Sequence, residues 1–248
     1  MNKKNLPDMQ KNFFIIEGIS VVKEYLQHKP QAVKYIVVKE KNSKKLEEVS
    51  KSVNIPLYIS DSLSHEERLY SKAPIWAVVE INCLGEQNFF EIYKKKQRQK
   101  DTLIALDHIT DPRNMGAIIR NAAFFGVDFI IAPKDRQVLL TQSCVSTSQG
   151  GLSLVEVVAV TNLARFIEKI KKESFWVIGA SAEGESIKSF KTNFDKKVLV
   201  FGAEEKGLSQ IIRKKCDIIL AIDRGVKNFD SLNVSVATGI MVHALKNT

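Results

Sequence analysis

From residue 101 to its end, the chain alternates between short apolar segments and segments with helical spacing, and this alternation constrains the fold more than any other feature. The expected strands are Leu103–Leu106, Phe129–Ala132, Val155–Val160, Phe175–Gly179, Val198–Phe201 and Ile218–Ile222. The expected helices are Gly116–Phe125, Gln142–Gln149, Leu163–Lys172, Leu208–Lys214 and Val234–Leu245. Strands that are apolar nearly throughout, and that alternate with helices, predict an α/β fold. Its sheet should be mostly parallel, with helices on both faces.

Residues 1–81 are expected to form a smaller α/β unit before this sheet. Apolar residues at Val21, Val22, Tyr25 and Leu26 have helical spacing. The expected strands are Tyr35–Val38, Pro56–Ile59 and Ile75–Ile81, with a helix at Lys44–Lys51 and a polar tail at Asp61–Tyr70. About 80 residues is near the lower limit of a domain that folds alone.

Residues 82–100 are expected to be a basic linker between the two units. Hydrophobic periodicity fades there, and the segment ends in the basic run 94–100. A short helix at Phe89–Tyr93 is the only regular structure expected. The basic run is compatible both with contact to a polyanion and with a solvated tether.

The charge balance narrows the class of partner. The net charge is +9, and residues 1–100 hold 18 basic and 12 acidic side chains. This excess favours a polyanionic partner, although a lysine-rich surface alone accounts for it equally well.

No apolar run approaches the roughly 18 residues of a membrane span, and no signal peptide is evident, so we expect a soluble cytoplasmic protein. Cys83, Cys144 and Cys216 lie too far apart in sequence to suggest a zinc site or a disulfide framework.

Ligands of parallel sheets bind beyond the carboxyl ends of the strands. The loops after Leu106, Phe201 and Ile222 are therefore the candidate site. In the first loop, Asn114 is a plausible helix N-cap. His108 has no evident partner, so it is interpreted as structural and is not assigned to catalysis.

Arg120 is the most informative residue of the helix that follows the first loop, because the rest of that helix is largely apolar. An arginine on a core-facing helix needs an anionic partner or a polar cleft, and its planar fork suits a phosphate. Exposure to solvent, or pairing with a structural carboxylate, is the alternative.

The second and third loops are rich in glycine and small residues. Gly202 and Gly207, five residues apart after a buried strand, allow close approach of the backbone to a ligand. The spacing is neither a dinucleotide fingerprint nor a P-loop, which argues against a nicotinamide-dependent enzyme and an ATPase. In the third loop, Ser231–Gly239 leads into a helix. Gly239 there indicates close packing against a ligand or a neighbouring helix.

Together the three loops resemble the SpoU/TrmH family of RNA 2′-O-methyltransferases, in the SPOUT superfamily. The first family motif matches Asn114, Gly116 and Arg120; the second matches Leu199–Phe201 with Gly202, Glu204, Gly207 and Leu208; the third matches Ser231–Gly239. Phe14–Gly18 resembles the start of the small RNA-binding domain of the family.

The resemblance implies a SPOUT methyltransferase domain over residues 101–248, with a trefoil knot that holds the cofactor S-adenosylmethionine. It also implies a homodimer, and an RNA-binding domain over residues 1–81. By the same resemblance, the residues that contact the cofactor are Gly202, Gly207, Ile222 and Leu232, and the catalytic residues are Asn114, Arg120, Glu204, Ser231 and Asn233. A front domain is typical of the 23S rRNA guanosine enzymes, so rRNA is favoured and tRNA is the alternative.

The sequence departs from the family pattern in three places. Asp223 stands where a proline is common, the stretch Arg224–Asp230 is about two residues longer, and around Val145–Ser153 a lysine and a glutamate are replaced. These departures motivate a second hypothesis, in which the chain is a non-catalytic RNA-binding or ribosome-assembly protein on the same fold.

Overall fold

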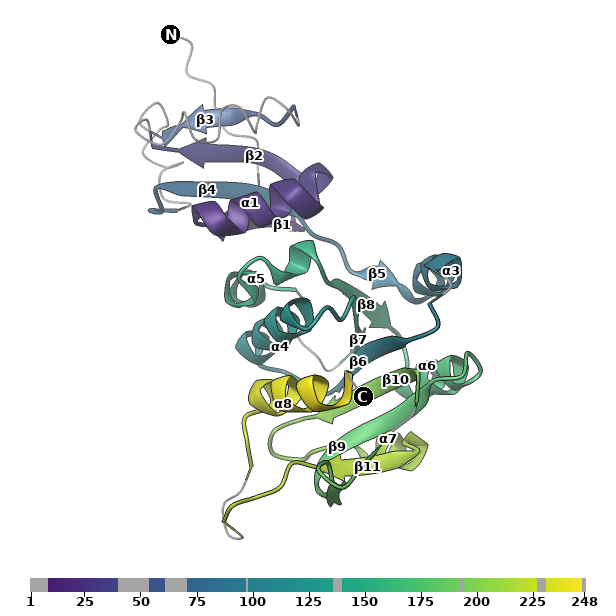
Figure 1. Cartoon of the computed structure of the whole chain (residues 1–248). Helices are drawn as coiled ribbons and strands as arrows, with labels where there is room; N and C mark the ends of the chain where they lie inside the picture. Colours follow the sequence, from purple (N-terminus) through teal and green to yellow (C-terminus); the bar gives the residue numbers. More distant parts are fainter. Residues whose placement is uncertain are drawn as a thin grey trace.

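The protein contains two β-sheets, one in each of two units that follow each other along the chain (Figure 1). A computed structural model describes residues 9–39, 54–60, 71–96, 98–135, 140–191, 194–226 and 231–246. The predicted helix 44–51 and the polar stretch 61–70 lie outside these residues.

The N-terminal unit is a four-stranded sheet in the order β1-β4-β2-β3, with a helix packed against it. Its elements are β1 (Phe13–Glu17), α1 (Ile19–His28), the 3-10 turn η1 (Pro30–Ala32), β2 (Val33–Val38), β3 (Leu57–Ile59) and β4 (Ile75–Glu80). β4 runs antiparallel to both β1 and β2, whereas β2 and β3 are parallel. Helix α1 buries Val22, Tyr25 and Leu26, the spacing from which it was predicted.

The C-terminal unit is a seven-stranded sheet in the order β11-β9-β10-β6-β7-β8-β5, and all of its strand pairs are parallel. The strands are β5 (Leu84–Gly85), β6 (Asp101–Asp107), β7 (Phe129–Pro133), β8 (Glu156–Val160), β9 (Trp176–Ser186), β10 (Lys196–Gly202) and β11 (Ile218–Ala221). The central strands are buried on both faces, as their apolar sequences require. The predicted parallel α/β sheet is confirmed.

Helices cover both faces of this sheet (Figure 1). One face carries α4 (Pro112–Phe124), α5 (Gln142–Ser148), the 3-10 turn η5 (Gly151–Ser153) and α8 (Val234–Lys246). The other carries α3 (Glu86–Lys96), α6 (Leu163–Lys171) and α7 (Gln210–Lys215). An aromatic cluster packs between the helices and the sheet on the second face. The ring centroid of Phe89 lies 5.1 Å from that of Phe129 and 5.5 Å from that of Phe166.

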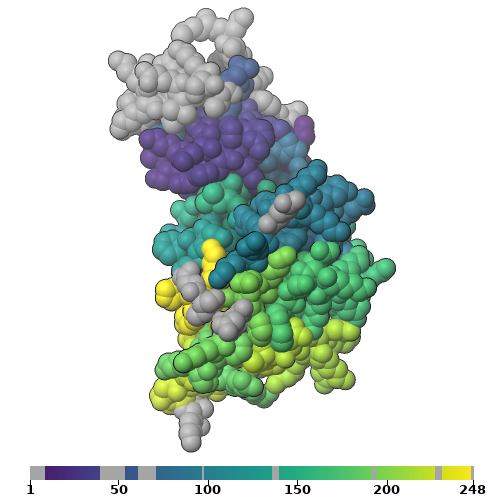
Figure 2. All heavy atoms as spheres, turned by 45° about the vertical axis from the view of Figure 1, so that its right-hand side comes forward, coloured from purple at the N-terminus to yellow at the C-terminus, as the bar shows by residue number. Residues whose placement is uncertain are grey.

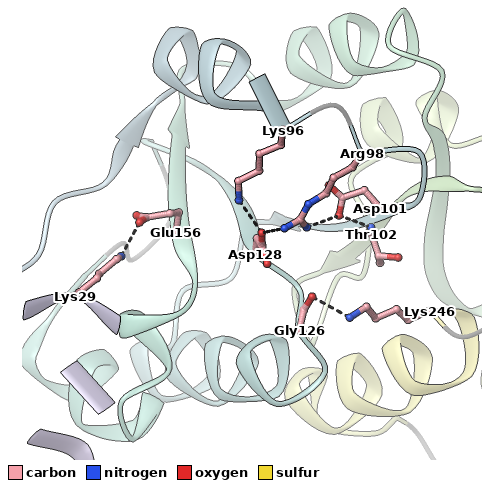
Figure 3. Close-up of polar contacts among 9 residues, drawn as sticks. All are labelled: Lys29, Lys96, Arg98, Asp101, Thr102, Gly126, Asp128, Glu156 and Lys246. Carbon is pink, nitrogen blue, oxygen red and sulfur yellow. Dashed lines mark hydrogen bonds and ion pairs between the residues drawn. The ribbon is translucent and has the colours of Figure 1, made fainter. Parts of the chain in front are cut away.

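Residues 84–96 of the expected linker pack on the large sheet as regular structure, and the short helix expected at Phe89–Tyr93 is part of the longer α3. β5 pairs with β8 at the edge of the large sheet, and α3 packs on the sheet with Phe89 and Tyr93 buried. These two aromatic residues are four apart, so they share one helix face, and the lysines of the basic run occupy the remainder. Lys96 and Arg98 then bind Asp128 at 2.8 and 2.6 Å (Figure 3). Lys96 and Arg98 therefore tie the end of α3 to the residue that precedes β7.

The N-terminal unit lies directly on α5 and η5, as the contact of the purple and teal parts in Figure 2 shows. The side chain of Gln142 accepts from the backbone N–H of Ile15 at 2.9 Å and donates to its carbonyl at 2.7 Å. Lys29 pairs with Glu156 at 2.6 Å (Figure 3). It also donates to the carbonyl of Leu152 at 3.1 Å. The amide of Gln142 thus continues the hydrogen bonding of β1 into the larger unit.

Within the described residues, no helix has both the length and the apolar character needed to cross a membrane.

Candidate active site

The three loops singled out in the sequence meet at the carboxyl edge of the sheet. β6 and β10 are neighbours, and Gly202 lies opposite Asp107 in their register, so both strands end at the same level. The loop after β6 and the turn after β10 therefore start side by side. Helix α8, which follows the third loop, packs against α4, which follows the first.

The turn after β10 depends on two glycines. The backbone folds back so closely that a Cβ atom on Gly202 would lie 2.1 Å from the carbonyl carbon of Gly207. Gly207 has φ +61°, and its N–H donates to the carbonyl of Ala203 at 2.8 Å. A side chain on Gly202 would force the turn open, whereas Gly207 has open space around it but a left-handed backbone that favours glycine.

A polar network joins all three loops. Glu204 accepts from the amide Nδ2 of Asn114 at 3.0 Å and from Nδ2 of Asn233 at 2.6 Å. Asn233 also donates to Oδ1 of Asn114 at 2.9 Å. Its own Oδ1 accepts from the backbone N–H and hydroxyl of Ser235 at the start of α8. One carboxylate thereby fixes the first, second and third loops relative to one another.

Asn114 is not the N-cap of α4, contrary to the sequence prediction. The cap is Asp111, whose side chain accepts from the N–H of Arg113, with Pro112 at the first helical position. Asn114 lies in the first turn, where its side chain is free to reach Glu204. The hydrogen bonds and the ion pair from Arg113 hold the pKa of the exposed Asp111 carboxyl below its usual value.

Two cavities share the turn 203–207. The first, named the β9-side cavity, has a volume of about 650 Å³, and its walls include Gly202, Glu204, Gly207, Ile222, Ser231 and Leu232. The second, named the α4-side cavity, has about 900 Å³, and its walls include His108, Asp111, Asn114, Glu204, Gly207 and Val234. Both volumes are in the range of small-molecule sites.

The structure thus brings together eight of the nine site residues expected from the sequence. Six line the β9-side cavity, and Asn114 and Asn233 join them through Glu204. Arg120 is the exception. It is exposed, it lines neither cavity, and it lies six residues beyond Asn114, about 9 Å along the helix axis. Within the residues described, its guanidinium has no hydrogen bond or ion pair.

Gly239 packs against a helix rather than a cavity. A Cβ atom there would lie 3.3 Å from Nδ2 of Asn121, and that amide donates to the carbonyl of Ser235 at 2.7 Å. The helix-packing interpretation of Gly239 is therefore the one that the structure supports. The small residues at the start of α8 let it approach α4 closely.

One wall of the β9-side cavity was not predicted from the sequence. β9 is longer than predicted, and its pairing with β11 shifts register between Ile219 and Leu220. The irregular stretch of β9 lines the cavity with residues 180–183. Gly179 and Gly184 flank this stretch, and a Cβ atom on either would lie 2.6 Å from Ile219. Two glycines five residues apart after a strand, as at 202 and 207, were the available signal.

The partner of His108, which was not predicted either, is Asp107, the residue before it. The buried carboxylate of Asp107 lies 2.7 Å from Nδ1 of His108, and its other oxygen accepts from the N–H of Ser209 at 2.7 Å. His108 has φ +63°, a left-handed conformation that directs a residue away from its strand.

Other chemistry-bearing groups lie outside the cavities. The described residues contain no cluster of three or more His, Cys, Asp or Glu side chains suited to a metal ion. The three cysteines are unpaired, and burial raises the pKa of Cys144 and of Cys216 to about 12. Such thiols stay protonated near neutral pH and are poor nucleophiles.

Comparisons with known proteins agree with this geometry. Residues 101–243 match the model of the SpoU rRNA Methylase family. The 23S rRNA (guanosine-2′-O-)-methyltransferase RlmB of Pseudomonas aeruginosa is 31% identical over 230 residues, covering 91% of this chain and 92% of that protein. A TrmH family tRNA/rRNA methyltransferase of Staphylococcus aureus is 35% identical over 177 residues, covering 70% of this chain and 71% of the relative.

Among solved structures, the SpoU methyltransferase AviRb of Streptomyces viridochromogenes, in complex with AdoMet, superimposes with a TM-score of 0.74. It is 20% identical and covers 94% of this chain and 89% of its own, so this likeness speaks for the fold alone. The family match includes all three loops and every residue of the polar network. The chain belongs to the SpoU rRNA Methylase family.

Proposed function

We propose that this RNA methyltransferase transfers a methyl group from S-adenosylmethionine to the ribose 2′-hydroxyl of a guanosine in 23S rRNA. The observation that carries the proposal is the convergence of three loops, far apart in sequence, on two adjoining cavities through one carboxylate, Glu204. The choice of a 23S rRNA guanosine rests on RlmB, whose similarity extends over both units of this chain. An enzyme with this substrate acts in the cytoplasm.

The β9-side cavity fits S-adenosylmethionine. Its volume of about 650 Å³ suits a ligand of that size, and the glycine turn presents bare backbone to it. Ile222, Leu232 and the backbone of Gly202 would hold the adenosine. Asp223 adds a carboxylate at the same wall, where the expected family pattern has a proline, and would attract the ammonium end. The bound cofactor supplies an activated methyl group.

Catalysis then depends on position and charge. We assign two roles to Arg120: it binds the adjacent phosphate of the RNA, and it stabilises the negative charge that develops on the ribose oxygen. Asn114, Glu204 and Asn233 hold the loops in register, and Ser231 lies at the cavity wall beside them. A guanidinium stays protonated in proteins, so Arg120 is not the base.

The isolated chain leaves Arg120 outside both cavities, and a homodimer accounts for this. Helix α8 and the residues before it expose Leu232, Val236 and Ile240 at helical spacing, and Phe124 on α4 is 83% exposed. We name these four residues the apolar stripe. Leu232 also lines the β9-side cavity, so a second copy on the stripe would lie at its mouth. We infer that Arg120 of one protomer serves the cavity of the other.

The test is to map 2′-O-methyl groups on rRNA and tRNA from cells with and without this protein. We expect loss of one mark, on a guanosine of 23S rRNA. Loss of a mark from tRNA instead would show that tRNA, not 23S rRNA, is the substrate. An unchanged set of marks in both RNAs would refute the proposed methylation activity. Calorimetric titration with S-adenosylmethionine adds a check, because the non-catalytic hypothesis motivated by Asp223 predicts no binding.

A further inference from the structure

The mechanism above leaves the proton of the ribose hydroxyl without an acceptor. One titratable pair at the site has no role in it, namely His108 and Asp107 at the carboxyl end of β6. Asp107 is 2% exposed, whereas the side chain of His108 is 43% exposed and lines the α4-side cavity. The pair therefore connects a buried carboxylate to the chamber beside the β9-side cavity.

The hydrogen bonds define which ring nitrogen is available. Both oxygens of Asp107 are acceptors: one takes the N–H of Ser209 and the other lies 2.7 Å from Nδ1 of His108. A carboxylate can only accept, so Nδ1 carries the hydrogen. In the neutral ring, Nε2 then keeps its lone pair and is a proton acceptor. His108 also has a left-handed backbone, and residues in such uncommon conformations cluster at functional sites.

The other titratable groups of the α4-side cavity are less suited to this task. Asp111 is held ionised by Arg113, which makes it a weak base. Glu204 accepts both amide hydrogen bonds on Oε1, and protonation of its carboxylate would weaken the charge-assisted bonds that join the loops. Glu205 and Lys206 lie on the exposed turn between the cavities and complete the charged lining.

We propose that His108, oriented by Asp107, accepts the proton of the ribose 2′-hydroxyl. This inference rests on the proposed function. The proton passes from the hydroxyl to Nε2 while the ribose oxygen forms its bond to the methyl carbon. The methyl–sulfur bond breaks with its electron pair on sulfur, which leaves a neutral thioether. The imidazolium then releases its proton to water, and Asp107 stabilises the ring while it is charged.

Two substitutions test the proposal without imposing strain. His108→Asn tolerates the left-handed backbone and cannot take the proton, and His108→Gly leaves room for added imidazole. The assay uses 23S rRNA from cells that lack the protein as substrate and measures the single-turnover rate of methylation. We expect a loss of about 10²–10⁴-fold in rate at pH 7.5, the usual range for general base catalysis. S-adenosylhomocysteine affinity and RNA affinity should be unchanged.

The pH profile separates a base from a structural residue. The wild-type rate should rise tenfold per pH unit in the acidic range and then level off, whereas that of His108→Asn should keep rising into the alkaline range. Imidazole should restore part of the rate of His108→Gly. Glu168→Gln, at an exposed ion pair on α6, is the control that should match wild type.

Three outcomes would overturn the proposal: a His108→Asn rate within threefold of wild type, a pH profile unchanged by the substitution, or a loss explained entirely by weaker RNA binding. A wild-type protein that methylates no RNA would instead refute the proposed function. The two failures are therefore distinguishable.

Discussion

Strands β6 and β10 carry charged residues at both ends, and the two ends differ in how those charges are satisfied. At the amino ends, Asp101 accepts from the N–H of Thr102 at 2.8 Å beside Arg98 (Figure 3). Buried Lys197 donates to the carbonyl of Leu245. At the carboxyl ends, the polar groups around Asp107 and Glu204 line two cavities. Charge that is enclosed by the chain's own groups affects stability alone, and charge that faces a cavity is available for chemistry.

Arg120→Ala should have the largest effect. Loss of the phosphate contact and of charge stabilisation in the transition state should reduce the single-turnover rate by about 10³-fold or more. Calorimetric S-adenosylhomocysteine binding should persist, because Arg120 lines neither cavity. A rate within a few-fold of wild type would remove Arg120 from the site.

A mixed dimer sharpens this prediction. A heterodimer of Arg120→Ala and Asn233→Ala protomers, purified with two different tags, has one intact site if Arg120 acts across the interface. It should then show about half of the wild-type rate. If Arg120 acts within its own chain, every site is damaged and the heterodimer is as slow as the parent variants.

Gly202→Ala should weaken cofactor binding at the carboxyl edge of the sheet. The added methyl group would lie 2.1 Å from the backbone of Gly207, so the turn must open. We expect calorimetric affinity for S-adenosylhomocysteine to fall by about 100-fold or more, equivalent to roughly 3 kcal/mol. Gly85→Ala, where a Cβ atom meets nothing within 4 Å, is the matched control and should bind normally. Normal affinity of Gly202→Ala would contradict the assignment.

Glu204→Ala should have a smaller effect, of about 10–100-fold on rate, because it removes the acceptor of two hydrogen bonds to a charged group. Glu204→Gln keeps an oxygen acceptor and should lose less. Single-turnover rates of both variants make the comparison. Equal rates for alanine and glutamine would indicate that the network does not position the loops.

A substitution at the amino ends of β6 and β10 should change stability and not the methylation rate, and its effect should be the smallest of those predicted here. Burial raises the pKa of Asp101, so the folded protein retains this proton to a higher pH than the unfolded chain. Asp101 therefore reduces the free energy of unfolding as the pH rises above the ordinary aspartate pKa. Asp101→Asn should raise Tm at pH 7 by roughly 1–4 °C, with little difference near pH 3. A change in the methylation rate would break the distinction between the two ends.

The sequence was sufficient to predict the sheet and the convergence of the three loops that form the candidate site. Strands such as Val198–Phe201 are apolar throughout, which only burial on both faces explains, and the loops after them follow from parallel topology. The trefoil knot and the homodimer, which the resemblance implies, stay predictions. Neither a crossing of the chain nor a partner copy leaves a local pattern in the sequence. The position of Arg120 outside both cavities could not be predicted for the same reason.

Two further differences have a local cause. In residues 84–96, Phe89 and Tyr93 bury one helix face, although the lysines around them suggested a tether. The pairing of His108 with Asp107 joins adjacent residues, which point to opposite sides in an extended strand. It arises only because His108 leaves the strand with positive φ, and sequence periodicity carries no signal for that.

A crystal structure with S-adenosylhomocysteine would show whether the three loops form one cofactor site. We expect the adenosine in the β9-side cavity, against Gly202, Ile222 and Leu232, with the sulfur directed towards Glu204 and the α4-side cavity. Ligand bound elsewhere on the chain, or none at millimolar concentration, would contradict it.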